Sequence, residues 1–436
     1  MEQKKMRTQN KEKILSRQID IKIIVFSFMF CVYPFLVIPN NLGYFYFPRF
    51  IALLIISVLC VLELLKNKKN FSRIHVFLAL YLLCVINSSV TAISSYTAWF
   101  GLFGIQGVPV PGKENTLTLA TTARFTGFIT ILCCVILYLT AFKVEKRDKL
   151  MAAMILCASI VGLISLLQYF GINIVPHEAS RDRFLAYGTM GNPNFLASYT
   201  AFMLPAAIYK YIKSHGMLWI ISSVLIYGGI LVSCTRGVWI AGAISMVVMA
   251  VYYIRNEQYR KPFAKIIISL TVVTAVLMPI NDGYLFKKAL SIPVNLSSGL
   301  QFDDSAGSGR MYIWKETLKL IPDNWAFGIG PDNLIYKGIY TRNGVVDKAH
   351  NIYLETAVTM GIPALVFYLA FLSFFIFRRW KTDKDFMFFS MISTYLIQGF
   401  FNIDVIMVLP LFWIVLGLYQ SNMEEEKLIE RSKAYV

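Results

Sequence analysis

Arginine residues beside apolar segments are the side chains of this sequence whose type and spacing best suit the binding of an anion. Arg236 lies in the segment Ser233-Cys234-Thr235-Arg236-Gly237 between two apolar stretches. Arg310 begins a segment with apolar residues at helical spacing, which Pro322 ends. Guanidinium groups bind phosphate oxygens through paired hydrogen bonds, and a helix N-terminus adds free amides. Both arginines are candidates for an anion site; the alternatives are an interfacial anchor for Arg236 and a solvated charge for Arg310.

His350 is the candidate for a general base. It precedes Asn351 and an apolar stretch that contains Glu355. A histidine with a pKa near neutrality can take a proton from a hydroxyl, although a structural role is the alternative. Glu355 is a functional candidate because a carboxylate inside an apolar span is costly; its alternative role is to anchor a polar partner.

Motifs for cofactor chemistry are not found in this sequence. There is no Walker A pattern, zinc ligand set or Gly-x-Ser-x-Gly, and Gly328-Ile329-Gly330 does not lie in a strand–helix unit. The segments around Gly328 and Gly191-Asn192-Pro193-Asn194 have turn composition, and Asn194 is predicted to cap a helix. We therefore expect neither a metal nor a cofactor.

The elements that must position these residues are apolar helices. The chain has 436 residues, of which 57% are hydrophobic and 15% charged, which excludes an ordinary soluble domain. A membrane-spanning helix needs about 20 mostly apolar residues, and about twelve such stretches are present. The predicted spans are 21–38, 48–65, 74–94, 123–142, 150–170, 193–212, 217–234, 237–254, 263–280, 352–377, 385–400 and 403–420. We predict an all-α, polytopic membrane helix bundle.

The positive charge is interpreted as a topology signal. The net charge is +17 and Lys plus Arg number 42. With a cytoplasmic N-terminus and twelve spans, most of these cations fall in cytoplasmic segments, as the positive-inside rule requires. Both termini are then cytoplasmic, whereas Arg236, Arg310 and His350 face the outside. The charge therefore indicates a lipid bilayer and no nucleic-acid partner.

The same topology divides the chain into segments. Residues 1–22 are a cytoplasmic tail, and 23–280 carry nine spans. Residues 281–350 form a long extracytoplasmic loop, expected to be catalytic and to carry a short amphipathic helix. Residues 351–420 carry three more spans, and 421–436 form a second cytoplasmic tail.

Several segments, in their order along the chain, carry a family resemblance that is strongest from about 181 to 365. They are Arg124-Phe125-Thr126-Gly127, Gly191-Asn192-Pro193-Asn194, Ser233-Cys234-Thr235-Arg236-Gly237, Ser308-Gly309-Arg310 through Trp314, Phe327-Gly328-Ile329-Gly330 and Ala349-His350-Asn351. Together they resemble motifs of the O-antigen ligase / O-antigen polymerase superfamily, whose members are bacterial membrane glycosyltransferases that use polyprenyl-diphosphate-linked glycans.

The resemblance implies roles for individual residues. Arg236 and Arg310 would bind the donor diphosphate, and His350 would deprotonate the acceptor hydroxyl, in a metal-independent and inverting transfer. The expected supporting residues are Arg124, Arg181, Arg183, Asn194, Trp314, Asn351 and Glu355. Arg181 and Arg183 flank an aspartate, and the alternative for both is that they are ordinary surface charges. The implied location is the bacterial cytoplasmic (inner) membrane.

The resemblance leaves the acceptor open. A ligase passes the glycan to a lipid or wall polymer, a polymerase passes it to a second lipid-linked repeat, and a protein O-glycosylating relative passes it to Ser or Thr. We expect an O-antigen ligase-like glycosyltransferase, with a repeat-unit polymerase as the alternative. A transporter or flippase of lipid-linked sugars is a second alternative, for which we find no repeat between halves.

Overall fold

The computed structural model describes residues 21–38, 43–66, 73–109, 117–142, 144, 147–175, 186–341 and 344–434. Arg181 and Arg183 lie outside these residues. The described chain is mostly helical, as predicted. The all-α prediction needs one correction, because two small antiparallel sheets are also present.

The helices and strands follow one another along the chain. Those of the first half are α2 (Ile21–Cys31), η1 (Tyr33–Phe35), α3 (Phe47–Lys66), α4 (Arg73–Val90), α5 (Ser95–Phe100), β1 (Phe103–Pro109), β2 (Leu117–Ala123), α6 (Phe128–Thr140), α7 (Arg147–Tyr169), α8 (Pro193–Ser214), α9 (Met217–Val232) and α10 (Arg236–Arg255). Those of the second half are α11 (Glu257–Leu277), α12 (Ile280–Leu300), α13 (Ala306–Lys319), α14 (Ile321–Asn324), η2 (Leu334–Lys337), β3 (Tyr340–Thr341), β4 (Gly344–Val345), α15 (Ile352–Met360), α16 (Ile362–Ile376), α17 (Asp383–Gly399) and α18 (Leu409–Ala434). β1 pairs with β2, and β3 pairs with β4.

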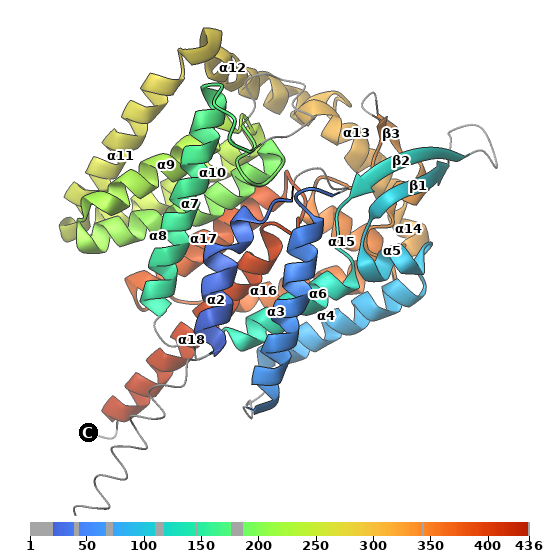
Figure 1. Cartoon of the computed structure of the whole chain (residues 1–436), viewed down its shortest axis with the longest axis horizontal. Helices are drawn as coiled ribbons and strands as arrows, with labels where there is room; N and C mark the ends of the chain where they lie inside the picture. Colours follow the sequence, from blue (N-terminus) through green and yellow to red (C-terminus); the bar gives the residue numbers. More distant parts are fainter. Residues whose placement is uncertain are drawn as a thin grey trace, which may run out of the picture.

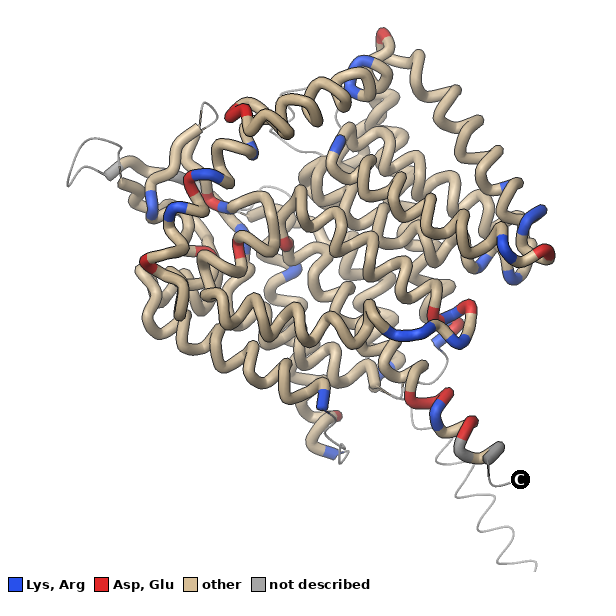
Figure 2. The backbone as a smooth tube through the Cα atoms, turned by 180° about the vertical axis from the view of Figure 1, so that it is seen from behind, with Lys and Arg blue, Asp and Glu red and all other residues tan. Residues whose placement is uncertain are grey.

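Apolar helices lie near the predicted spans, but the count of twelve spans is not confirmed. Among the described residues, four helices are long and apolar enough to cross a membrane, namely α3, α4, α7 and α10. The count becomes five if α11 and α12 are taken as one span broken by a 114° bend. The stretch 352–377 is divided at Gly361, whose φ of 91° ends α15 after nine residues. Charged residues lie mainly near the ends of helices and in the segments that connect them, and most of the helical tube carries none (Figure 2).

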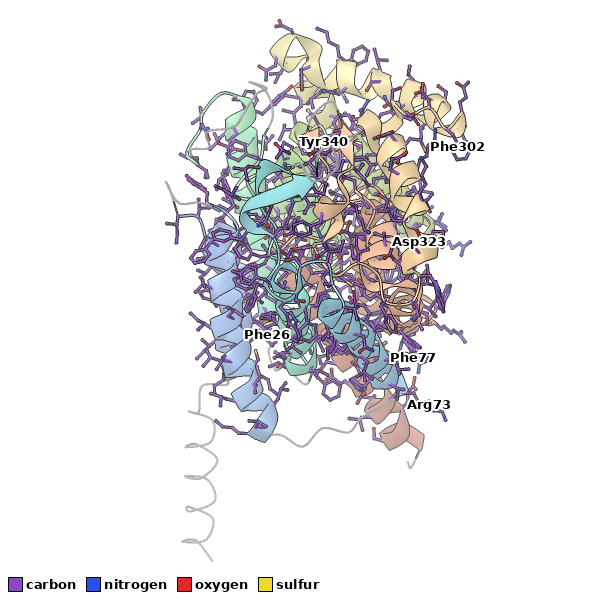
Figure 3. All side chains as sticks on the ribbon, turned by 90° about the vertical axis from the view of Figure 1, so that its right-hand side faces the viewer. Phe26, Arg73, Phe77, Phe302, Asp323 and Tyr340 are labelled. Carbon is purple, nitrogen blue, oxygen red and sulfur yellow. The ribbon has the colours of Figure 1, made fainter. Side chains whose placement is uncertain are left out.

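The core of the bundle is built around α8. Most of its side chains are buried, as expected for a helix that is apolar on every side. It packs against α7, α9 and α17. In the side view of Figure 3, Arg73 at the start of α4 lies low in the molecule, and Tyr340 of β3 lies well above it.

The segment 281–350 is more regular than the predicted loop. It includes most of the helix α12, which bends sharply away from α11 at one end of the molecule (Figure 1). The expected short helix after Arg310 is present as α13. Left-handed residues precede each helix body, at 281–283 in α12 and at 307–309 in α13. Only Leu285 of α12 is buried, so α12 forms an outer wall of the fold.

Candidate active site

A cavity of about 720 Å³ lies where the N-termini of α8 and α10 meet α12 and α13. Its lining includes Asn194, Arg236, Gly237, Arg310 and Trp314. These residues come from three motifs that are far apart in the sequence. The structure therefore brings the two candidate anion-binding arginines to one site.

Arg236 is the first residue of α10 and follows a tight turn in which Cys234 is left-handed, with a φ of 53°. Its guanidinium donates hydrogen bonds to Ser291 Oγ at 2.9 Å and to Ser308 Oγ at 2.6 Å. Both partners are neutral hydroxyls that orient the group. Within the described ranges Arg236 forms no ion pair, so its positive charge stays available to a ligand.

Arg310 approaches Arg236 from α13. A Cβ atom added to Gly237 would lie at an ordinary contact distance of 3.5 Å from Arg310 Nη1 but only 2.6 Å from the Cβ of Phe401, so glycine is needed here for the packing of Phe401. Burial, together with the charge of Arg236, lowers the pKa of Arg310 to about 10. Arg310 also lacks an ion-pair partner in the part of the chain that is described. Two adjacent cations without a counter-charge favour a bound anion.

The remaining walls of the cavity combine polar and apolar groups. Ile240 of α10 and Ile292 and Leu296 of α12 form an apolar side. Lys288 and Asn295 of α12 also line the cavity, and both were missed because α12 was predicted as loop. Their spacing with Ser291, which is helical, is the signal that could have placed all three on one helix face.

Trp314 lines the cavity one turn beyond Arg310. Its ring packs edge-to-face on Phe400, with the ring centroids 5.3 Å apart. The indole Nε1 is buried and has no hydrogen-bond partner among the described residues. A buried donor of this kind is usually satisfied, so a ligand oxygen in the cavity would suit it.

His350 lies on the segment against which α13 packs. Ile313 of α13 joins Ala349 and Val358 in one apolar cluster, and this packing holds Arg310 and His350 in the same region. His350 is not among the described residues that line the cavity. The imidazole Nδ1 is buried and without a hydrogen-bond partner among the described residues, so it is free to accept a proton.

The surroundings of His350 keep it neutral. Burial, followed by the positive charge of Arg310, lowers its pKa to about 4. Asp347 acts in the opposite direction, whereas Arg124 and Lys348 add to the lowering. At neutral pH the imidazole is therefore unprotonated, which is the form a general base needs.

Arg124 and Asp347 form an ion pair beside His350. Arg124 Nη2 lies 2.8 Å from Asp347 Oδ2, and Nη1 donates to the Tyr46 hydroxyl at 2.9 Å. The hydroxyl of Thr122 donates to the same carboxylate at 3.1 Å. Arg124 is thus compensated, unlike Arg236, and presents no free charge to a donor.

Two expected supporting residues hold the start of α15. Asn351 Oδ1 accepts hydrogen bonds from the backbone N–H groups of Tyr353 and Leu354, both at 3.0 Å, and so caps the helix. Glu355 Oε2 accepts from the backbone N–H of Ala349 at 2.7 Å. Glu355 therefore has the anchoring role that was its alternative reading.

The predicted cap at Asn194 is wrong by two residues. Asn192 caps α8, since its side chain accepts from the backbone N–H of Asn194 at 2.8 Å. Pro193 is the first helical residue, where proline has no amide to leave unsatisfied. The side chain of Asn194 instead accepts from Thr235 Oγ1 at 3.3 Å, which ties α8 to the turn that carries Arg236.

The Gly328-Ile329-Gly330 segment is a packing motif. A Cβ atom on Gly328 would lie 2.3 Å from the carbonyl of Thr359, and one on Gly330 would lie 2.3 Å from the Cβ of Ala92. Gly330 N–H donates to the Thr359 carbonyl at 2.8 Å. These glycines let the loop lie directly on the end of α15.

Apolar helices long enough to cross a membrane and a cationic cavity between helix ends are therefore the two main features of this protein. Residues 221–369 match the family model of O-antigen ligase, and this confirms the resemblance noted in the sequence. The matched segment contains Arg236, Arg310 and His350. No curated protein matches the chain. Residues 221–369, about a third of the chain, are thus similar to the O-antigen ligase family.

Proposed function

We propose that the protein moves a glycan from a polyprenyl-diphosphate carrier to an acceptor hydroxyl at the outer face of the cytoplasmic membrane, as an O-antigen ligase does. The observation that carries this proposal is the uncompensated pair Arg236 and Arg310 in one cavity. The expected partners are a lipid-linked glycan donor, a glycan, lipid or wall-polymer acceptor, and the bilayer.

The cavity suits a donor that is charged at one point and apolar at another. Its arginines are complementary to the diphosphate, which offers oxygens to both guanidinium groups. Its apolar wall, with Ile240 and Leu296, suits the adjoining carrier chain. A free sugar nucleotide would not use that wall.

The transfer would need one proton acceptor and one stabilised leaving group. His350 takes the proton of the acceptor hydroxyl, and the hydroxyl oxygen forms the new bond to the anomeric carbon. The bond from that carbon to the phosphate oxygen breaks, and its electron pair leaves with the polyprenyl diphosphate. Arg236 and Arg310 stabilise the negative charge that develops there. Attack opposite the leaving group inverts the anomeric centre.

Binding of the donor would also adjust the base. Because the charge of Arg310 lowers the pKa of His350 in the empty site, a bound diphosphate that offsets this charge raises that pKa toward neutrality. A base with a pKa nearer the working pH is more effective. The donor would thus help to activate His350.

The test uses the purified full chain in detergent with lipid-linked glycan extracted from the host strain. We expect His350→Ala and Arg310→Ala to lose transfer by about 10²-fold or more. Lys319→Ala, at an exposed position on α13, is the control and should transfer normally. Full transfer by the His350 or the Arg310 variant would contradict the proposal for that residue.

The same materials separate the alternatives. Consumption of the donor in detergent indicates transfer, since a transporter needs two separated compartments. In a deletion strain, full-length glycan that accumulates on the carrier indicates a ligase. Single repeats that accumulate on the carrier indicate a polymerase.

A further inference from the structure

We propose that Lys348 is a positioning residue for His350, because its buried ammonium group fixes the backbone that presents the imidazole. The proposal rests on the proposed role of His350 as the base. It concerns a cluster of charged side chains, Lys348, Asp332 and Glu355, that we call the Lys348 cluster.

The Lys348 cluster joins segments that are distant in the sequence. Lys348 is 5% exposed and Asp332 is 1% exposed. The ammonium group forms ion pairs with Asp332 Oδ1 and, at 3.1 Å, with Glu355 Oε1. Asp332 also accepts hydrogen bonds from the backbone N–H of Leu102 at 3.1 Å and from the N–H and hydroxyl of Thr126 at 2.9 and 2.5 Å. One lysine therefore locks the start of β1, the loop before α6 and the start of α15 together.

The lock acts directly on the backbone before His350. The side chain of Lys348 and the backbone N–H of Ala349 both bind Glu355, which lies one turn into α15. His350 follows with a left-handed φ of 53°, a conformation that costs a non-glycine residue roughly 1 kcal/mol or more. Such a residue persists only when its neighbours determine its backbone, and the Lys348 cluster supplies that constraint.

The charge of Lys348 also reaches the imidazole. Burial alone would lower the pKa of Lys348, but Asp332 and Glu355 hold it above its ordinary value, so the group stays charged. The groups that act on His350 are Arg310 from α13, Arg124 from the loop before α6, and Asp347 and Lys348 from its own segment. Loss of the Lys348 charge removes one cation that lowers the pKa of His350.

The experiment compares Lys348→Met with the wild type and with Lys319→Met, an exposed control on α13, in transfer assays with extracted lipid-linked glycan. Binding of inorganic pyrophosphate is measured in parallel by calorimetry. We expect Lys348→Met to lower kcat by about 10²-fold, as a small displacement of a catalytic group does. Pyrophosphate affinity should stay unchanged, because Arg236 and Arg310 are untouched. The acid limb of kcat/KM should move to higher pH.

Because Lys348→Met leaves Asp332 as an unpaired buried carboxylate, the double variant K348M/D332N is measured beside it. The amide oxygen of the new side chain still accepts from Thr126, so this variant keeps the packing and loses the ion pair. It should show the same loss of kcat and the same shift of the pH profile.

A double-mutant cycle decides the role of Lys348. If Lys348 acts through His350, Lys348→Met in the His350→Ala background should cost less than about twofold more. The proposal would be overturned if Lys348→Met lowered kcat in the His350→Ala background by the same factor as in the wild type. An unchanged kcat in both Lys348 variants, or weakened pyrophosphate binding, would overturn it as well. Full activity of His350→Ala alone would instead overturn the proposed role of His350 as the base, on which this proposal rests.

Discussion

Replacing Arg310 by glutamine should stabilise the empty protein while abolishing its affinity for the donor. Arg310 holds a positive charge beside Arg236 with no described counter-charge. Its charge therefore destabilises the folded protein, and only a bound anion offsets this effect. Glutamine keeps much of the side-chain length and removes the charge.

The magnitude follows from the pKa of Arg310. Burial and the charge of Arg236 lower it from its ordinary 12.5 to about 10, and a pKa difference of one is worth about 1.4 kcal/mol. The folded pKa lies below the unfolded value, so the cost of the charge is fully present below pH 10 and fades as the pH rises to 12.5. The full difference corresponds to about 3 kcal/mol, which partial exposure of the side chain reduces to about 1–2 kcal/mol.

The assay is thermal unfolding of the purified protein in detergent, with and without inorganic pyrophosphate. Arg310→Gln should unfold at a higher temperature than the wild type when no anion is present. Pyrophosphate should raise the midpoint of the wild type, because a ligand that binds only the folded state stabilises it, and should leave Arg310→Gln unchanged.

The matched control is Arg124→Gln, since Arg124 has the ion-pair partner that Arg310 lacks. Loss of Arg124 leaves Asp347 unpaired and should lower the free energy of unfolding by about 3 kcal/mol. The two substitutions thus have opposite signs. An Arg310→Gln protein that is less stable than the wild type, or one that pyrophosphate stabilises equally, would refute the reasoning.

Three further outcomes are expected. Gly328→Ala should destabilise the protein by about 2 kcal/mol or more in a melting assay, because its Cβ would lie 2.3 Å from the Thr359 carbonyl and its φ is 69°. The control is Gly242→Ala in α10, whose Cβ would meet nothing within 4 Å. This control should be neutral or slightly stabilising in the same assay. The acid limb of kcat/KM, which reports the free enzyme, should lie well below pH 6.5, because the pKa of His350 is lowered to about 4; a limb near 6.5 would exclude His350 as that base. Asn351→Ala should cost about 1 kcal/mol of unfolding free energy through the lost cap of α15, and unchanged melting would contradict that role.

Sequence reasoning placed most helices because apolar periodicity and turn residues are local properties. The stretches 48–65, 74–94 and 150–170 correspond closely to α3, α4 and α7. The number of membrane spans could not be predicted from the sequence, because the position at which each helix ends depends on tertiary packing. The helix α12 was missed because its exposed polar residues resemble those of a loop.

Residue type and motif order are enough to predict Arg236 and Arg310 as candidates for anion binding and His350 as a candidate for proton transfer. Which of the cations have a counter-charge depends on the fold. Arg124 is compensated by Asp347, whereas Arg310 faces Arg236. Such pairings join residues far apart in the chain, and no local pattern records them. For the same physical reason the Lys348 cluster could be recognised only once the fold had brought its segments together.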